Sequence, residues 1–256
     1  MSPSLHSVSS LSLEEKFLQL SLHQTTHFWT TVDNGFSTLT TLNDTDTPSP
    51  AIFTVLGSIE SSPRHVAAVH GNYRCPTLAV PSLTEARLFL TLGGKGLSQG
   101  EGKRFEQSLS FLDKVLGSCS AASEHLKSVG IRKETRLEME HRLFQKVEDG
   151  DFPFMHRDFE DRYKRNGTAG WPVLPEAEAE LHEVVYSRSH KVAPLPVLKH
   201  GVMIPPDMWA AELRPGTVVE VDFSITLRVS EKDYRNIFNA RMSTVRIVRT
   251  RSSRVV

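Results

Sequence analysis

Aromatic and basic side chains alternate along one stretch of the chain, from Phe154 to Trp171. The aromatic members are Phe154, Phe159, Tyr163 and Trp171, and the basic members are Arg157, Arg162, Lys164 and Arg165. An aromatic ring that stacks on a nucleic-acid base contributes about 1–3 kcal/mol, and neighbouring cations contact the phosphates. The pattern predicts a surface that binds single-stranded nucleic acid.

More cations follow near the carboxyl end, where five arginines occur without an acidic residue between them: Arg241, Arg246, Arg249, Arg251 and Arg254. We expect Arg246, Arg249 and Arg251 to extend the same surface. A second interpretation stays open. Phe159 and Tyr163 lie four residues apart, as on an apolar helical stripe packed against the core, and the neighbouring acids would then pair the cations.

The tripeptide His156-Arg157-Asp158 matches two catalytic signatures in part. A kinase catalytic loop needs an asparagine five residues after the aspartate to hold a metal ion, and Tyr163 occupies that position. A non-haem iron site needs a second histidine beside the His-x-Asp pair, which His190 or His200 would have to supply. A metal-dependent enzyme built on His156 and Asp158 is therefore kept as a third hypothesis.

No motif in the sequence predicts a cofactor. The loop Gly93-Gly94-Lys95-Gly96 lacks the glycine and hydroxyl spacing of a Walker loop, and neither G-x-S-x-G nor H-E-x-x-H occurs. One charged cluster is interleaved with basic residues, as on a solvated helix face; its members are Glu134, Glu138, Glu140 and His141. We expect no catalytic residue, no bound metal and no cofactor.

Composition limits the classes of partner. Thirty basic residues balance thirty acidic ones among 256, so only local patches can attract nucleic acid or an anionic surface. Cys75 and Cys119 are too few for a disulfide framework. No apolar run approaches the roughly 20 residues that span a bilayer. These features predict an intracellular protein, cytoplasmic or nuclear, without a membrane partner.

The clearest structural pattern lies between Leu213 and Val248. Apolar and polar residues alternate strictly from Val219 to Val229, which places them on opposite faces of a strand. A second alternating run includes Phe238, Ala240 and Met242, and it changes phase near Ser243-Thr244, as a β-bulge would allow. The sequence predicts a long antiparallel hairpin with one buried face.

The remaining elements predict an α+β protein in three parts. Residues 1–50 are expected to be helical or flexible, although Asn34-Gly35 would also suit a hairpin turn. Residues 51–151 are expected to be a mixed region with a pair of helices, Arg104–Val129 and Lys133–Val147. Residues 152–256 are expected to form the β-rich module.

Part of the last third of the chain resembles an uncharacterised family of predicted proteins from mushroom-forming fungi. The resemblance rests on the segments 192–197 (VAPLPV), 204–206 (IPP) and 213–221 (LRPGTVVEV) and on the strand from Phe238 to Val248. It implies fold more than activity. A long, bulged hairpin after a proline-rich extended strand also looks like part of a small antiparallel β-barrel of the OB type, a fold that often binds single-stranded nucleic acid.

The leading hypothesis is thus a non-enzymatic binding module for single-stranded nucleic acid. The stacking residues would be Phe159, Tyr163 and Trp171, and the phosphate contacts would come from Arg157, Arg162, Lys164, Arg165, Arg246, Arg249 and Arg251. The alternative is a protein–protein scaffold or homo-oligomer that uses the helical pair or a strand edge.

Overall fold

The computed structural model describes residues 28–32, 36–42, 48–63, 65–120, 127–129, 132–133, 135–147, 167–230 and 235–250. The predicted helix near the amino terminus and the stretch Phe154–Arg165 fall outside these ranges. Among the described residues, no helix is both long and apolar enough to cross a membrane.

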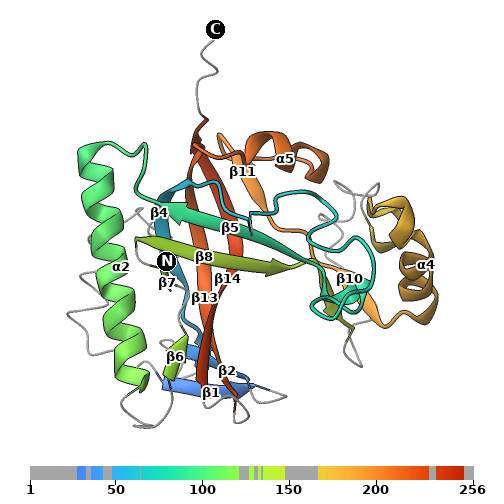
Figure 1. The fold of residues 1–256 in the computed structure, drawn as a ribbon, viewed down its shortest axis with the longest axis horizontal. Coiled ribbons are helices and arrows are strands. Elements are labelled where there is room, and N and C mark those ends of the chain that lie inside the picture. The colour runs from blue at the N-terminus through green and yellow to red at the C-terminus, as the bar shows by residue number, and fades with distance from the viewer. Residues whose placement is uncertain are drawn as a thin grey trace, which may run out of the picture.

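Five strands close into a barrel at the centre of the structure (Figure 1). They are β4 (Phe53–Ile59), β5 (Arg87–Gly93), β8 (Arg136–Arg142), β13 (Val218–Ser230) and β14 (Arg235–Arg249). Around the ring, β4 pairs with β5, β5 with β8, β8 with β14, β14 with β13, and β13 again with β4. The β8–β14 pair is parallel and the other four are antiparallel.

The barrel forms because each strand presents apolar side chains at alternate positions. Every second residue of β13 from Val219 to Ile225 is buried, and polar residues lie between them. The other strands add interior side chains with the same periodicity: Phe53, Val55, Leu88, Leu90, Leu92, Leu137, Met139, Phe238, Ala240 and Met242. Burial of each large apolar side chain stabilises the fold by about 1.5–3 kcal/mol.

The predicted hairpin is confirmed, and so is its bulge. Asp222 pairs with Thr244, whereas the next residue, Phe223, pairs with Met242, so Ser243 is the extra residue. The insertion reverses the phase of β14, and Val245 and Ile247 therefore return to the buried face. The Ser243 hydroxyl donates to the Asp222 carbonyl oxygen at 3.1 Å, which holds the bulge.

Further short strands pair with the strands of the barrel. β2 pairs with β13, and β1 and β3 pair with β2. β11 pairs with β14 and β12 with β11, while β6 pairs with β14 and β7 with β8. Their bounds are as follows: β1 (Phe28–Val32), β2 (Phe36–Leu42), β3 (Pro48–Pro50), β6 (Lys127–Val129), β7 (Arg132–Lys133), β11 (Val197–Lys199) and β12 (Val202–Met203).

The amino-terminal segment differs from its predicted helical or flexible character. Residues 28–32 and 36–42 form the antiparallel pair β1–β2, with Val32 opposite Phe36. The β-branched threonines of both segments favour strands, and β2 pairs with β13.

The first helix of the predicted pair is confirmed up to Ser120, whereas Lys127–Val129 at its expected end form β6, and the second helix is wrong. α2 (Gln99–Ser120) packs on β4 and buries Phe105, Leu109 and Leu112. Residues predicted as the second helix form β7, β8 and β9 (Phe144–Lys146) instead. The charged residues of β8 alternate with Leu137 and Met139, and this period of two places the apolar pair inside the barrel.

On the side of the barrel opposite α2, α4 (Glu178–Ser187) packs beside β10 (His190–Val192), which pairs with β9 in a separate two-stranded sheet (Figure 1). The short helices η1, η3 and η4 contact α4 and lie at Leu83–Glu85, Thr168–Gly170 and Pro175–Ala177. Two more, η5 and α5, follow one another at Pro206–Met208 and Trp209–Glu212.

The fold is thus α+β with a closed barrel, as the sequence predicts. Five strands in which the first pairs with the second and the fourth, and the third lies parallel to the fifth, have the arrangement of an OB barrel. Strands on both sides of residue 151 contribute to this one barrel. The predicted boundaries at residues 50 and 151 are not tested by these pairings and stay a prediction.

Candidate functional site

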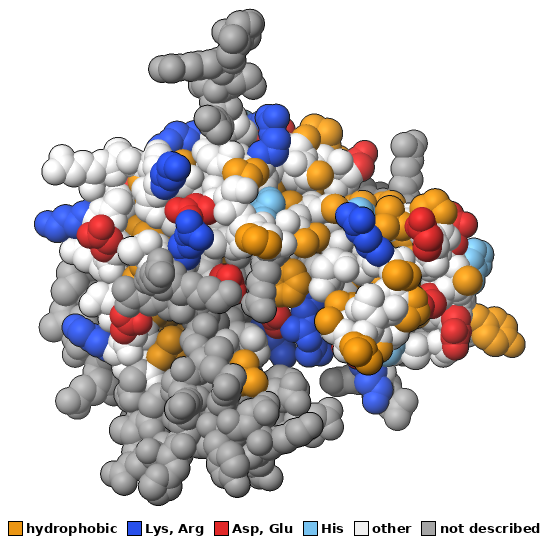
Figure 2. All heavy atoms as spheres, viewed as in Figure 1, with side chains coloured by type: hydrophobic (Ala, Val, Ile, Leu, Met, Phe, Trp, Pro, Cys, Tyr) orange, Lys and Arg blue, Asp and Glu red, His pale blue; other side chains and the backbone are white. Residues whose placement is uncertain are grey.

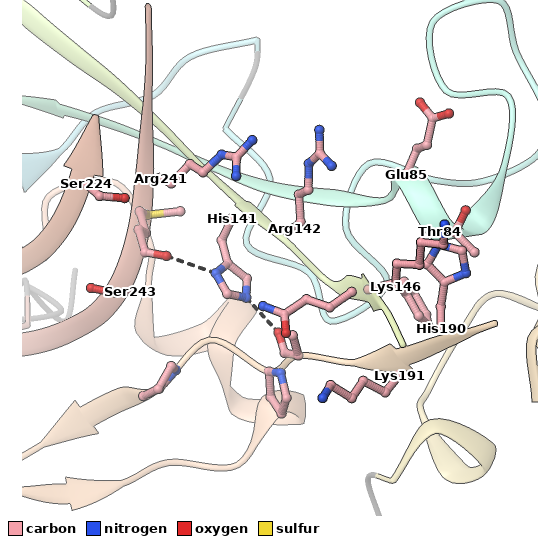
Figure 3. A pocket seen from close by; sticks show the side chains of 16 residues that line it. Thr84, Glu85, His141, Arg142, Lys146, His190, Lys191, Ser224, Arg241 and Ser243 are labelled. Carbon is pink, nitrogen blue, oxygen red and sulfur yellow. Dashed lines mark hydrogen bonds between the residues drawn. The ribbon is translucent and has the colours of Figure 1, made fainter. Parts of the chain in front are cut away.

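A pocket of about 960 Å³ opens where β8 leaves the barrel (Figure 3). Its wall comes from η1, from β8 with β9 and β10, from the extended segment 193–196, and from β13 with β14. The residues that line it are Thr84, Glu85, His141, Arg142, Phe144, Gln145, Lys146, His190, Lys191, Ala193, Pro194, Pro196, Ser224, Arg241, Met242 and Ser243.

The backbone explains why the chain opens here. After Arg142, the residue Leu143 interrupts the strand, and its amide donates to the Ala86 carbonyl oxygen at 3.0 Å. Its own carbonyl oxygen accepts from the Ala193 amide at 2.7 Å. The chain then continues as β9, which pairs with β10 rather than with the barrel. β9 and β10 therefore extend away from β14, and the space beside β14 stays open.

Helix α4 anchors the opposite rim of the pocket. The Glu180 carboxylate accepts hydrogen bonds from the Tyr73 hydroxyl and, at 2.9 Å, from the Leu83 amide. Leu83 begins η1, which also carries Thr84 and Glu85 of the pocket wall. The rim is therefore attached to α4 through the Glu180 carboxylate.

The charged side chains that line the pocket are mostly basic. Four of its side chains are cations, Arg142, Lys146, Lys191 and Arg241, against the single carboxylate of Glu85. In space-filling view, Lys and Arg side chains gather between the barrel and the part of the molecule that carries α4 (Figure 2). A concave site lined by one sign of charge concentrates ligands of the opposite sign.

The pKa values of the lining groups show that these cations are crowded. Burial lowers the pKa of Arg241, and the charge of Arg142 lowers it further. Burial and the charge of Arg87 lower the pKa of Arg142, and burial and Lys146 do the same for His190. Glu140 opposes this repulsion in part, but its carboxylate lies 2.6 Å from the Arg87 guanidinium and pairs with it. An anion in the pocket would relieve the repulsion.

His141 lies at the inner end of the pocket with both ring nitrogens next to carbonyl oxygens (Figure 3). Nδ1 is 3.0 Å from the Met242 oxygen, and Nε2 is 2.7 Å from the Ala193 oxygen. The ring therefore connects β8 to β14 and to the segment that follows β10. Burial lowers the pKa of His141, and the two carbonyl oxygens act in the opposite direction.

Most of the site residues that the sequence predicts lie outside the described ranges. These are Arg157, Phe159, Arg162, Tyr163, Lys164, Arg165 and Arg251. Their proposed roles in stacking and phosphate contact stay predictions.

Trp171 is described, and its ring belongs to the core. It is 2% exposed, its Nε1 donates to the Val69 carbonyl oxygen at 3.1 Å, and its ring centroid is 6.0 Å from that of Trp209. The face predicted to stack on a base is therefore covered by protein.

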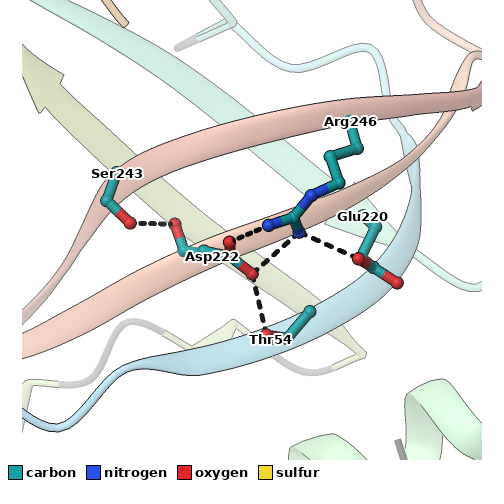
Figure 4. Close-up of polar contacts among 5 residues, drawn as sticks. All are labelled: Thr54, Glu220, Asp222, Ser243 and Arg246. Carbon is teal, nitrogen blue, oxygen red and sulfur yellow. Dashed lines mark hydrogen bonds and ion pairs between the residues drawn. The ribbon is translucent and has the colours of Figure 1, made fainter. Parts of the chain in front are cut away.

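Arg246 and Arg249 both pair with carboxylates, on a different part of β14 from the pocket. Arg246 contacts Glu220 at 2.9 Å and also pairs with Asp222, which in turn accepts from the Thr54 hydroxyl at 2.7 Å (Figure 4). Arg249 contacts Glu101 at the start of α2 at 2.6 Å. The structure does not bring these arginines together with Trp171, and their charges are largely neutralised.

The pocket contains cations that the sequence analysis did not select, namely Arg142, Lys146, Lys191 and Arg241. Arg142 was placed on a helix, together with Glu138 and Glu140. The alternation of Leu137 and Met139 with charged residues could have identified a strand. No local pattern could have shown that residues 142 and 241 lie in one pocket, because their proximity depends on the parallel β8–β14 pairing.

No group of three or more His, Cys, Asp or Glu side chains suited to a metal ion occurs among the described residues. His156 and Asp158, the basis of the metalloenzyme hypothesis, lie outside those residues.

No family model matches the chain, and no curated protein matches it. Among solved structures it is similar to gp2.5, a single-stranded DNA binding protein encoded by bacteriophage T7, at 13% identity and a TM-score of 0.42, covering 80% of this chain and 96% of that one. It is also similar to the single-stranded DNA-binding protein from bacteriophage Enc34, at 12% identity and a TM-score of 0.35, covering 90% and 96%. The same phage protein in complex with ssDNA gives 14% identity and a TM-score of 0.33, with 90% and 97% covered. The OB assignment made here rests on the strand pairings.

Proposed function

We propose that this protein is a non-enzymatic module that binds single-stranded nucleic acid, with a backbone phosphate held in the basic pocket. The observation that carries the proposal is the position of that pocket on an OB barrel. OB barrels bind oligonucleotides on the face of their second and third strands and with the neighbouring loops. In this chain β5 and β8 are those strands, and the pocket uses the end of β8 and the loop that leads into β5.

Chemistry within the pocket also supports an anionic ligand. Arg142 and Arg241 approach it from two strands of the barrel, and Lys146 and Lys191 approach from the small β9–β10 sheet. Arginine and lysine are the side chains that contact phosphate in nucleic-acid complexes. The similar phage proteins are single-stranded DNA-binding proteins, a class whose ligand carries the same phosphates.

Among the described residues, the pocket suits a phosphate better than a stacked base. Its one phenylalanine, Phe144, is 2% exposed and has no free face. The imidazole of His190 is partly exposed and is the described lining group best suited to contact a base. Stacking by Phe159 and Tyr163 remains part of the proposal as a sequence prediction.

The scaffold alternative loses one of its two predicted surfaces. The apolar side of α2 packs on β4, and the residues of the second expected helix are strands. A seam between two helices is thus not formed by the described residues. The relationship to fungal proteins of the same type stays a prediction that bears on fold alone.

The test is fluorescence anisotropy of the full chain with a labelled oligothymidine, measured at several salt concentrations. We expect binding at low salt that weakens steeply as salt rises, because each phosphate contact releases counterions. The variant Arg142→Glu/Lys146→Glu should lose most of the affinity, since two lining cations become anions.

The matched control reverses two exposed cations on α2, Lys103→Glu/Lys114→Glu, with the same change in net charge. It should retain binding close to wild type if the pocket is the site. Absence of binding at low salt would refute the function. Equal losses in the two double variants would refute the assignment of the pocket.

A further inference from the structure

His141 has an arrangement of partners that only its protonated form can satisfy. Carbonyl oxygens accept hydrogen bonds and cannot donate them, and both ring nitrogens lie within hydrogen-bond distance of one. A neutral imidazole carries a single N–H, so one of its nitrogens would direct a lone pair at a carbonyl oxygen. The imidazolium donates from both nitrogens and satisfies both contacts.

The two carbonyl groups belong to the segments that carry the phosphate-binding cations. Met242 directly follows Arg241 on β14, and Ala193 lies two residues after Lys191. Arg142 directly follows His141 on β8. A doubly donating ring at position 141 would therefore hold three cations of the pocket at fixed separations.

Charged groups lie on every element next to this ring, although Arg142 extends to the opposite side of β8 from it (Figure 3). Arg142 and Glu140 lie on its own strand, Arg87 on β5, Arg241 on β14, Lys146 on β9, and His190 and Lys191 on β10; Glu85 lies on η1. Glu140 pairs with Arg87. Burial disfavours a positive charge at His141, and a bound anion would favour it.

We propose that His141 takes up a proton when a phosphate group occupies the pocket, so that binding of nucleic acid at this site is coupled to proton uptake. This inference rests on the proposed function and adds a positioning residue with a regulatory consequence.

The coupling has a defined sign. If the bound phosphate raises the pKa of His141, affinity is constant at high pH and rises as pH falls through the pKa of the complex. It becomes constant again below the pKa of the free protein. A rise of one pKa unit corresponds to about a tenfold gain in affinity across this range.

Isothermal titration calorimetry of the full chain with an oligothymidine lacking a terminal phosphate tests the coupling directly. Phosphodiesters do not titrate near neutrality, so a difference in heat between buffers of unlike ionisation enthalpy reports protons taken up by the protein. We expect His141 to take up at most about one proton, at pH values between the pKa of the free protein and that of the complex, because one imidazole accepts one proton.

Three substitutions identify the group that receives the proton. His141→Asn keeps one donor but cannot titrate, so uptake should vanish and affinity should become less dependent on pH. His182→Asn, on the exposed face of α4, should keep the uptake. His190→Asn removes the other histidine of the pocket, at which a bound anion would also favour a proton, and the uptake at His141 should remain.

Binding without proton uptake by the wild-type protein would overturn the inference and leave the proposed function standing. Loss of uptake in His190→Asn but not in His141→Asn would overturn it too. No binding at any pH would refute the proposed function itself. Because the absence of uptake in the wild type, or its complete loss in His190→Asn, would each overturn the inference, the test survives a His141→Asn variant that fails to fold.

Discussion

Replacement of Arg142 by glutamine should weaken nucleic-acid binding and make it less sensitive to salt. Arg142 is exposed at the end of β8 and lines the pocket. The charge of Arg87 lowers the pKa of Arg142, and the charge of Arg142 lowers the pKa of Arg241. Glutamine keeps much of the side-chain length and removes the charge, so the substitution isolates the electrostatic contribution.

The magnitude follows from the exposure of the guanidinium. An exposed ionic contact contributes about 1 kcal/mol or less at moderate salt, which corresponds to about a fivefold increase in Kd. Each phosphate contact on a single strand contributes about 0.7 to the slope of log K against log salt. We therefore expect Arg142→Gln to reduce the slope by about 0.7.

Anisotropy titrations across a salt series measure both quantities in one experiment. Arg104→Gln is the matched control, because Arg104 is an exposed arginine on α2, away from the pocket. It should leave the slope unchanged. Equal slopes for Arg142→Gln and wild type, or equal losses in the two variants, would show that the contact at position 142 does not exist.

Three further expectations concern the arginines and the tryptophan that the sequence had assigned to ligand binding. Trp171→Phe should lower the free energy of unfolding in urea by about 1–3 kcal/mol, through a lost buried hydrogen bond and lost volume, with oligonucleotide affinity unchanged; reduced affinity at unchanged stability would instead indicate stacking. Arg246→Gln should cost about 1–2 kcal/mol of unfolding free energy, because it leaves the mostly buried Asp222 without its cation, and should not alter the salt slope of binding; a changed slope would place a phosphate at this arginine. The Arg249 guanidinium, together with hydrogen bonds from Ser98, lowers the pKa of Glu101 from 4.5 to about 2, so these contacts stabilise the fold above pH 4.5 and their contribution is lost as pH falls through about 2. Glu101→Gln should therefore reduce stability at pH 7, by less than about 1 kcal/mol for an exposed pair, and match wild type near pH 2; a deficit that persists at pH 2 would contradict this assignment.

The sequence alone determined the elements whose pattern is both local and strong. The alternation from Val219 to Val229 fixed β13, and the phase change near Ser243 correctly located a bulge before any pairing was known. The spacing of Phe105, Leu109 and Leu112 fixed the apolar side of α2. In each case one side of the element is apolar at a period that a single backbone conformation satisfies.

Where the pattern is short or mixed, tertiary contacts decided the outcome. β8 has only seven residues, and its charges resemble those of a solvated helix, yet the barrel needs a strand between β5 and β14. The aromatic and basic residues around Trp171 predict that it binds a ligand, but the Val69 carbonyl oxygen and the ring of Trp209 hold it inside the core.

The pocket itself depends on the tertiary structure alone. Arg142 and Arg241 are separated by most of the carboxyl-terminal half of the chain, and each is unremarkable in its local sequence. They line one pocket because β8 and β14 pair in parallel for two residues and β9 then diverges toward β10. Charge in a sequence indicates which side chains can attract phosphate, whereas the field that a ligand meets depends on the distances between those charges, and the closing of the barrel sets those distances.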